Sequence, residues 1–234
     1  MVVELYLDLL CQPCRSVYIF AKKNNIPFEF KHVELLKGEH LCEEFDKVNL
    51  LRKVPALRDG NFTLAESIAI LLYLSRKFNT PDHWYPSDVQ KRARVDEYLS
   101  WQHTAIRAQG CNFYRTKVLM PLLVGKPFPA ERLERAVEDL KSTMKQFEEK
   151  FLQDKPFIVG SEISLADLMA IAELMQALGA GWDVFEGRPK LTEWRHRVEE
   201  AIGKELFREA HEVKRDGAKM FVDAPNETQR LTWC

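Results

Sequence analysis

The chain has 234 residues, with 34 basic and 35 acidic side chains and a net charge of −1 at pH 7. This balance provides no extended positive surface for nucleic acid or for an anionic membrane, so neither is expected as a partner. Hydrophobic residues make up 46% of the sequence, which is ordinary for a globular protein, and the length fits one large domain or two small ones.

The N-terminal residues and the cysteines predict a cytoplasmic protein. Glu4 and Asp8 interrupt the first apolar stretch and no basic leader precedes it, so a signal peptide is not expected. Charges interrupt the other apolar stretches before they reach membrane-spanning length. An odd number of cysteines spread over a long chain is not the disulfide framework of a secreted domain, which favours a reducing compartment. These cysteines are Cys11, Cys14, Cys42, Cys111 and Cys234.

The first 35 residues predict a β-α-β unit. Apolar residues alternate from Val3 to Leu9, which is the period of a strand. Pro13 suits the first turn of a helix, where its missing N–H group costs nothing, and residues 28–35 predict a second strand. A crossover of this length is typical of two parallel strands.

A β-hairpin and a further helix are predicted next. Residues 54–57 and 62–64 flank Asp59-Gly60, and this dipeptide favours the positive φ of a tight hairpin turn. The residues that follow the hairpin have the apolar face of a helix. The order β-α-β-α-β-β-α therefore predicts an α/β domain with a mixed sheet over residues 1–78.

The remainder of the chain predicts a second, all-helical domain over residues 88–213. Residues 79–87 contain two prolines and no helical period, so they predict a linker between the domains. Ser87 and Gln90 have the spacing of a capping box at the start of a long helix. Residues 214–234 have few apolar side chains and predict an irregular tail.

A second capping box is predicted inside the helical domain. Ser164 and Asp167 have the required spacing, and an apolar run follows them. We therefore expect a helix to begin at Ser164, held by reciprocal hydrogen bonds between the two residues.

Two cysteines lie where the first predicted strand meets the first predicted helix. A C-x-x-C motif at this place in a β-α-β unit, here Cys11-Gln12-Pro13-Cys14, is typical of a thioredoxin-like redox site. The free N–H groups and the dipole of the helix N-terminus favour an anion at Cys11. In the alternative interpretation, Cys14 is a small buried residue on the inner face of the helix, as free cysteines usually are.

Two further segments have the chemistry of a peptide-binding site. If the Val54-Pro55 bond is cis, the Val54 backbone faces outward and can pair with a peptide ligand as an added strand. At Glu66-Ser67, a helix N-terminus, a hydroxyl group and a carboxylate can bind the charged end of an amino acid. Each segment has an ordinary alternative, which is a trans proline at the start of a strand or a simple helix cap.

The order of four motifs resembles the cytosolic glutathione transferases. These motifs are CQPCR, KVPALRDG, LAESIAILLYL and ISLADL. Four stretches are similar to the theta class specifically, namely LYLDLLCQPCRSVYIFAKKN, TPDHWYPSD, RARVDEYLSWQH and VFEGRPKL. The similarity extends from about Glu4 to Val213, and it implies a thioredoxin-like N-terminal domain followed by a helical C-terminal domain.

The resemblance implies that five residues of the first domain bind glutathione. Val54 would pair with the cysteinyl backbone of the tripeptide. Glu66 and Ser67 would hold its γ-glutamyl end. His40 and Lys53 would face its glycyl carboxylate.

Three more residues complete the implied site. Thr104 matches a further glutathione-binding position. Arg107 matches an arginine near the reacting sulfur, and without the resemblance it would be taken as a solvated helical charge. Cys11 occupies the position where the theta class has a serine, whose hydroxyl group stabilises the glutathione thiolate. A thiol is a weaker hydrogen-bond donor, and it forms a mixed disulfide more readily. Tyr6, which lies in the middle of a strand, is expected to be a packing residue instead.

The resemblance implies an enzyme that conjugates the thiolate of glutathione to small hydrophobic electrophiles, a detoxification reaction. It also implies a homodimer with glutathione as co-substrate and an electrophile pocket between the domains. No metal or other cofactor is expected, because the histidines and cysteines lack metal-ligand spacing. Two alternatives stay open: a glutathione-dependent thiol–disulfide oxidoreductase that uses Cys11 and Cys14, and a non-enzymatic glutathione-fold binding protein.

Overall fold

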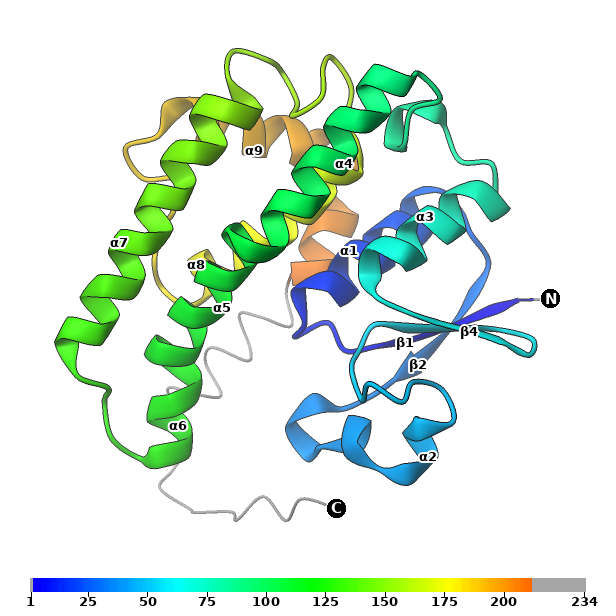
Figure 1. The fold of residues 1–234 in the computed structure, drawn as a ribbon, viewed down its shortest axis with the longest axis horizontal. Helices are drawn as coiled ribbons and strands as arrows, with labels where there is room; N and C mark the ends of the chain where they lie inside the picture. The colour runs from blue at the N-terminus through cyan, green and yellow to red at the C-terminus, as the bar shows by residue number, and fades with distance from the viewer. Residues whose placement is uncertain (1, 212–234) are drawn as a thin grey trace. The chain divides into compact units, whose positions relative to one another are not determined.

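The computed structural model describes residues 2–211, except for the side chains of residues 122 and 123. Contacts between Cα atoms divide the chain into two compact units, and their residues can be found by the colour scale of Figure 1. The first unit is Met1–Thr80 with Glu205–Cys234, and the second is Pro81–Lys204.

The finer division that we infer from the sequence stays a prediction. It places domains at 1–78 and 88–213 with a linker at 79–87. The predicted tail at 214–234 lies outside the described residues.

A four-stranded mixed sheet forms the centre of the first unit. Its strands are β1 (Val3–Leu7), β2 (Phe28–His32), β3 (Ala56–Asp59) and β4 (Phe62–Ala65), in the spatial order β2-β1-β3-β4. β1 is parallel to β2 and antiparallel to β3, and β3 is antiparallel to β4. The predicted mixed sheet is therefore confirmed. The predicted hairpin joins β3 to β4, with Gly60 at a φ of 63° in its turn.

Helices cover both faces of this sheet. Figure 1 shows α1 (Gln12–Lys23) and α3 (Ser67–Lys77) side by side on one face and the short α2 (Glu43–Asp46) on the other. The alternating residues of β1 are buried, which is why the period of two predicted this strand. Two 3₁₀ turns, Leu35–Lys37 and Glu39–Leu41, follow β2.

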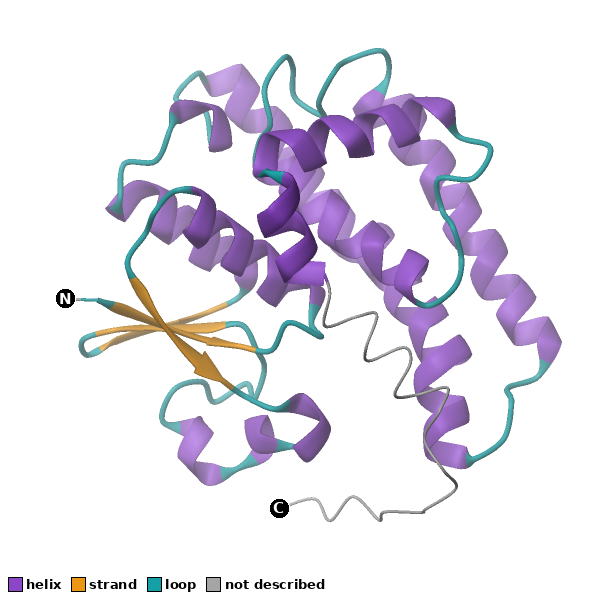
Figure 2. Cartoon of the chain, turned by 180° about the vertical axis from the view of Figure 1, so that it is seen from behind, coloured by secondary structure: helices purple, strands orange, loops and turns teal. Residues whose placement is uncertain are grey.

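Helices joined by loops make up the described part of the second unit, and Figure 2 shows strands only in the first unit. Its α-helices are α4 (Val89–Thr104), α5 (Ile106–Tyr114), α6 (Met120–Val124), α7 (Ala130–Gln146), α8 (Leu165–Gly179) and α9 (Pro189–Ile202). Two π-helical segments, Arg115–Leu119 and Phe147–Leu152, follow α5 and α7. Over residues 2–211, the chain has no helix with the length and apolar character needed to cross a membrane.

Residues 79–87 contain a 3₁₀ turn, Asp82–Trp84, and Trp84 is buried there. The capping box that we expect just after this turn is wrong in detail. The N-cap of α4 is Asp88 rather than Ser87, because the Asp88 carboxylate accepts from the backbone N–H groups of Gln90 and Lys91 at 3.1 and 2.9 Å. The Asp88 carboxylate thus binds two of the free N–H groups at the start of α4, and it takes the place of the predicted Ser87–Gln90 capping box.

The predicted capping box at Ser164 and Asp167 is confirmed, and it is part of a larger buried cluster. The Asp167 carboxylate accepts from the Ser164 N–H at 3.0 Å, the Ile158 N–H at 2.9 Å and the Trp194 Nε1–H at 2.9 Å. The Ser164 hydroxyl donates to it as well. Burial raises the pKa of Asp167, while these four hydrogen bonds act in the opposite direction. We call these four residues the Asp167 cluster.

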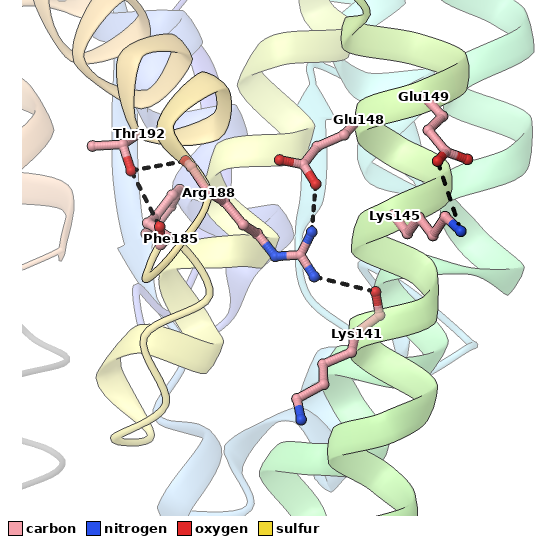
Figure 3. Close-up of polar contacts among 7 residues, drawn as sticks. All are labelled: Lys141, Lys145, Glu148, Glu149, Phe185, Arg188 and Thr192. Carbon is pink, nitrogen blue, oxygen red and sulfur yellow. Dashed lines mark hydrogen bonds and ion pairs between the residues drawn. The ribbon is translucent and has the colours of Figure 1, made fainter.

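A second polar contact joins the segment before α9 to α7. Figure 3 shows the Arg188 guanidinium between Glu148, with which it forms an ion pair, and the Lys141 carbonyl oxygen. Thr192 donates to the carbonyl oxygens of Phe185 and Arg188 at 3.2 and 3.1 Å. These bonds fix the segment that leads into α9.

Candidate functional site

The register of the sheet brings four loops to one edge. Tyr6 of β1 pairs with Ala56 of β3, which pairs with Ala65 of β4, and Leu7 pairs with His32 of β2. The chain therefore leaves β1, β2 and β4 and enters β3 at the same end of the sheet. The segments that carry Cys11, His40, Lys53 with Val54, and Glu66 with Ser67 all begin or end at this edge. We call it the site edge.

Asp8 fixes the loop that carries Cys11. Its side chain is buried, and it accepts from the backbone N–H of Leu10 at 2.9 Å and of Leu35 at 3.0 Å. The Cys11 N–H donates to the Asp8 carbonyl oxygen at 2.9 Å. The carboxylate thus ties the loop after β1 to the segment after β2, and it sets where α1 begins.

Cys11 is the N-cap residue of α1, and its thiol faces the loop before β3. The backbone of Cys11 is extended, and Pro13 occupies the first turn, as the sequence predicts. The half-buried Cys11 thiol donates to the Val54 carbonyl oxygen with an Sγ–O distance of 3.7 Å. Cys11 and Val54, which belong to two separate predicted binding segments, are therefore in contact.

Cys14 lies one turn further along α1 and is completely buried. A hydrogen bond joins its thiol to Cys11. Burial, followed by this hydrogen bond, raises the pKa of the Cys14 thiol well above its usual value. The buried position agrees with the interpretation of Cys14 as a packing residue. The contact with Cys11 agrees with the interpretation of the two cysteines as a redox pair.

Asn49 supports the loop before β3. Its side-chain amide donates to the Lys53 carbonyl oxygen at 2.8 Å, and its Oδ1 accepts from the Leu51 N–H at 3.0 Å. The Val54-Pro55 bond that follows is cis, and the Lys53 side chain is exposed. The hydrogen bond from Asn49 therefore fixes the backbone at Lys53, just before Val54.

Glu66 has an unusual backbone at the start of α3. Its φ is 68° and its ψ is 114°, a backbone conformation that residues other than glycine rarely adopt. Its side chain makes no capping hydrogen bond to α3 and is exposed, whereas Ser67 is buried. The simple helix cap is thus excluded as an account of Glu66. Strained residues persist mainly where function requires them, so the conformation points to a ligand contact.

His40 lies in the second 3₁₀ turn after β2 and is half-buried. Its Nδ1 atom is buried, with no hydrogen-bond partner among the described residues. Burial lowers the pKa of His40, while the negative charge of Asp8 acts to raise it.

The Tyr6 hydroxyl group is engaged within the sheet and is not available to donate a hydrogen bond to a thiolate. Its hydroxyl group donates to the Glu4 carboxylate at 2.9 Å, and its ring packs edge-on against Phe45. Burial, together with the hydrogen bond to Glu4, raises the pKa of Tyr6 to about 12. The structure thus agrees with the expectation of a packing residue.

Thr104 and Arg107 belong to the second unit. Thr104 is the exposed last residue of α4, and its hydroxyl group donates to the Trp101 carbonyl oxygen at 3.4 Å. Arg107, in the first turn of α5, forms an ion pair of 2.7 Å with Glu173 of α8. Glu173 is almost completely buried, so this pair joins two helices of the unit. The roles of Thr104 and Arg107 toward glutathione stay predictions.

Sequence reasoning missed Asp8, Asn49 and Glu173. All three support a predicted site residue by a hydrogen bond or an ion pair. Asp8 follows β1 and Asn49 follows α2, and short polar side chains at such places often bind backbone groups, which is a signal that could have found them. Glu173 lies in an apolar helix, and a buried acid there indicates a cationic partner.

Comparisons with known proteins agree with this geometry. Residues 4–76 match the family described as glutathione S-transferase, N-terminal domain, and residues 112–201 match glutathione S-transferase, C-terminal domain. The glutathione S-transferase theta-1 of Gallus gallus is 61% identical over 230 residues, covering 90% of this chain and 88% of its own.

Solved structures agree as well. The apo form of human glutathione S-transferase T1-1 has a TM-score of 0.91 at 58% identity, covering 93% of this chain and 91% of that one. A human theta-class glutathione transferase in complex with the glutathione conjugate of 1-menaphthyl sulfate has a TM-score of 0.91 at 50% identity, covering 95% and 91%.

The chain therefore belongs to the glutathione S-transferase family. The relatives named above are of the theta class, so the class that the sequence motifs imply is confirmed. The expected fold of a glutathione-transferase N-terminal domain and a helical C-terminal domain is confirmed too.

Proposed function

We propose that this protein conjugates the thiolate of glutathione to small hydrophobic electrophiles. The observation that carries the proposal is the contact of Cys11 with the Val54 carbonyl oxygen at the site edge. It puts the residue at the family's thiol-activating position beside the backbone that is proposed to hold the cysteinyl part of glutathione. The conjugate in the theta-class relative supports the same reaction class.

In the proposed complex, each part of glutathione has a partner at the site edge. The cysteinyl backbone pairs with Val54 as a short added strand. Glu66 accepts from the α-ammonium group, and the Ser67 hydroxyl and the N-terminus of α3 bind the α-carboxylate. Lys53 and His40 are proposed to bind the glycyl carboxylate.

Cys11 and Arg107 are proposed to carry the catalysis. The Cys11 thiol donates to the sulfur of glutathione in place of the Val54 carbonyl oxygen, and the free N–H groups at the start of α1 favour the thiolate there. Arg107 provides a positive charge for the thiolate, and Thr104 is proposed as a further glutathione contact. A lowered pKa of the glutathione thiol supplies the nucleophile at neutral pH.

A rate measurement on parent and variant tests this proposal. Glutathione-dependent release of halide from an alkyl or aryl halide should be observed for the parent protein. Cys11→Ser should raise the rate, because a hydroxyl group is the stronger hydrogen-bond donor. Cys111→Ser, which changes an exposed cysteine of α5, serves as the matched control and should not alter it.

Two outcomes contradict the proposal. Tight binding of glutathione without any conjugation would make the protein a non-enzymatic binding protein. A Cys11→Ser variant that conjugates no faster than the parent would show that Cys11 is not the limiting donor.

We further propose a cytoplasmic homodimer, in which glutathione is the only co-substrate and no cofactor is needed. Sedimentation of the purified protein measures its oligomeric state, and a monomer at the concentrations of the activity assay would contradict the dimer.

A further inference from the structure

The first turn of α1 contains a pair of thiols that conjugation does not require. Conjugation uses a hydrogen-bond donor at Cys11, and it assigns nothing to Cys14. Yet the two thiols share a hydrogen bond, and neither is in a disulfide in this structure. Cys11 is half-buried and Cys14 is completely buried. The Cys11 thiol is therefore accessible to a reagent, whereas the Cys14 thiol is accessible to Cys11.

We propose that Cys11 and Cys14 form a dithiol switch that glutathione disulfide closes and excess glutathione reopens. Cys11 is the thiol that is modified first, and Cys14 is the resolving thiol. The inference rests on the proposed glutathione site, because a glutathionyl group paired with Val54 has its sulfur beside Cys11. The oxidised protein has a Cys11–Cys14 disulfide and no thiol donor for conjugation.

The first step is a thiol–disulfide exchange. The Cys11 thiolate attacks one sulfur of glutathione disulfide, whose S–S bond breaks as the Cys11–glutathione S–S bond forms. The departing glutathione thiolate takes up the proton that the Cys11 thiol released. The N-terminus of α1 favours the attacking anion, and the half-exposed position of Cys11 admits the reagent.

The second step closes the switch. The Cys14 sulfur attacks the Cys11 sulfur, the mixed disulfide breaks, and the Cys14 proton passes to the departing glutathione. The two steps oxidise two protein thiols by two electrons and reduce one glutathione disulfide to two molecules of glutathione. Burial of Cys14 keeps it protonated in the reduced protein, so an external disulfide meets Cys11 and not Cys14.

The structure provides this step with a suitable geometry. Cys11 is the N-cap residue of α1, Cys14 lies in the first turn of that helix, and a hydrogen bond joins the two thiols. The Asp8 and Val54 contacts hold the Cys11 end of the pair, and the buried face of α1 holds the Cys14 end.

Mass spectrometry after treatment with glutathione disulfide tests the switch. The parent should lose two hydrogens and yield a peptide with a Cys11–Cys14 disulfide. Cys14→Ser should instead stop at one glutathionyl group on Cys11, because the resolving thiol is missing. Cys111→Ser is the matched control, and it should close the switch as the parent does.

Activity provides the second measurement. At one fixed concentration of glutathione, an excess of glutathione disulfide in the assay should abolish most of the halide conjugation by the parent, and removal of the disulfide should restore it. Cys11→Ser should keep its rate in glutathione disulfide, since it has no thiol to modify. Conjugation by the reduced protein is measured first, so a failure of the proposed function is seen separately from a failure of the switch.

Three outcomes would overturn the switch. In the first, the parent keeps a stable glutathionyl group on Cys11. In the second, the parent is oxidised only at Cys42 or Cys111. In the third, the Cys11–Cys14 disulfide forms but conjugation is unchanged. Each can be read from the parent alone, so an unstable Cys14→Ser variant does not prevent the test.

Discussion

The site edge of the first unit and the Asp167 cluster of the second unit use acidic residues in opposite ways. Asp167 is completely buried and accepts four hydrogen bonds from its own unit. Glu66 is exposed, has a positive φ and does not cap the helix that it precedes. Both residues stand at the start of a helix, yet only Asp167 stabilises its helix.

The difference teaches how structural and functional polar groups can be told apart. A structural carboxylate satisfies the donors around it, because an unpaired buried donor costs about 1–3 kcal/mol. A binding carboxylate is left available, and the fold tolerates local strain to hold it. The following experiments test this distinction, from the largest expected effect to the smallest.

The largest effect is expected for Asp167→Ala. The change leaves two backbone N–H groups and the Trp194 indole without an acceptor, and we expect the free energy of unfolding to fall by at least about 3 kcal/mol. Denaturant unfolding measures it. Asp183→Ala is the control, because Asp183 is exposed and accepts from one backbone N–H, of Phe185. Equal losses in the two variants would contradict the cluster's structural role.

A smaller loss of stability is expected for Arg107→Ala. The buried Glu173 loses the charge of its ion-pair partner, so the free energy of unfolding should fall by roughly 2–3 kcal/mol. Arg107→Ala with Glu173→Gln should recover part of this loss, and a double-mutant cycle measures the coupling.

The same variants test the proposed catalytic role of Arg107. If Arg107 acts on the thiolate, the double variant should remain slow in conjugation although its stability is partly restored. Recovery of both stability and rate would make Arg107 a structural residue only.

Glu66→Ala should act on binding and not on folding. The loss of a charge-assisted hydrogen bond should weaken glutathione binding by more than about 1 kcal/mol, which calorimetry measures. Glu66→Gly should weaken binding as much and raise the stability by up to about 1 kcal/mol, because glycine adopts a positive φ without strain. Glu44→Ala, an exposed acid of α2, is the control. Unchanged glutathione affinity in Glu66→Ala would remove Glu66 from the site.

The smallest effect is expected at Asp59, at the end of β3 opposite the site edge. Hydrogen bonds from Lys77, and then from Tyr73, lower the pKa of Asp59. A lowered pKa contributes stability above the usual pKa near 3.8, and the contribution is lost as the pH falls through the folded value. Asp59→Asn should therefore cost at most about 1 kcal/mol at neutral pH and less in acid. A difference between parent and variant that grows in acid would contradict this sign.

Local signals in the sequence predicted most elements of the first unit. The strand period, the proline of α1 and the Asp59-Gly60 turn each act within a few residues, so they can be recognised without the fold. At the start of α4, the competition between Ser87 and Asp88 was decided by which oxygen reaches the free N–H groups. Such a choice depends on backbone geometry, and a motif spacing does not determine it.

The sequence by itself determined the family and the C-x-x-C pair, and it predicted the positions that we propose to bind glutathione, because these depend on residue type and spacing along the chain. Only the tertiary structure decided that the Cys11 thiol faces Val54, that Asp8 ties two loops together, and that Glu66 does not cap α3. These are contacts or conformations that depend on sheet register, and register is set by the packing of all four strands at once.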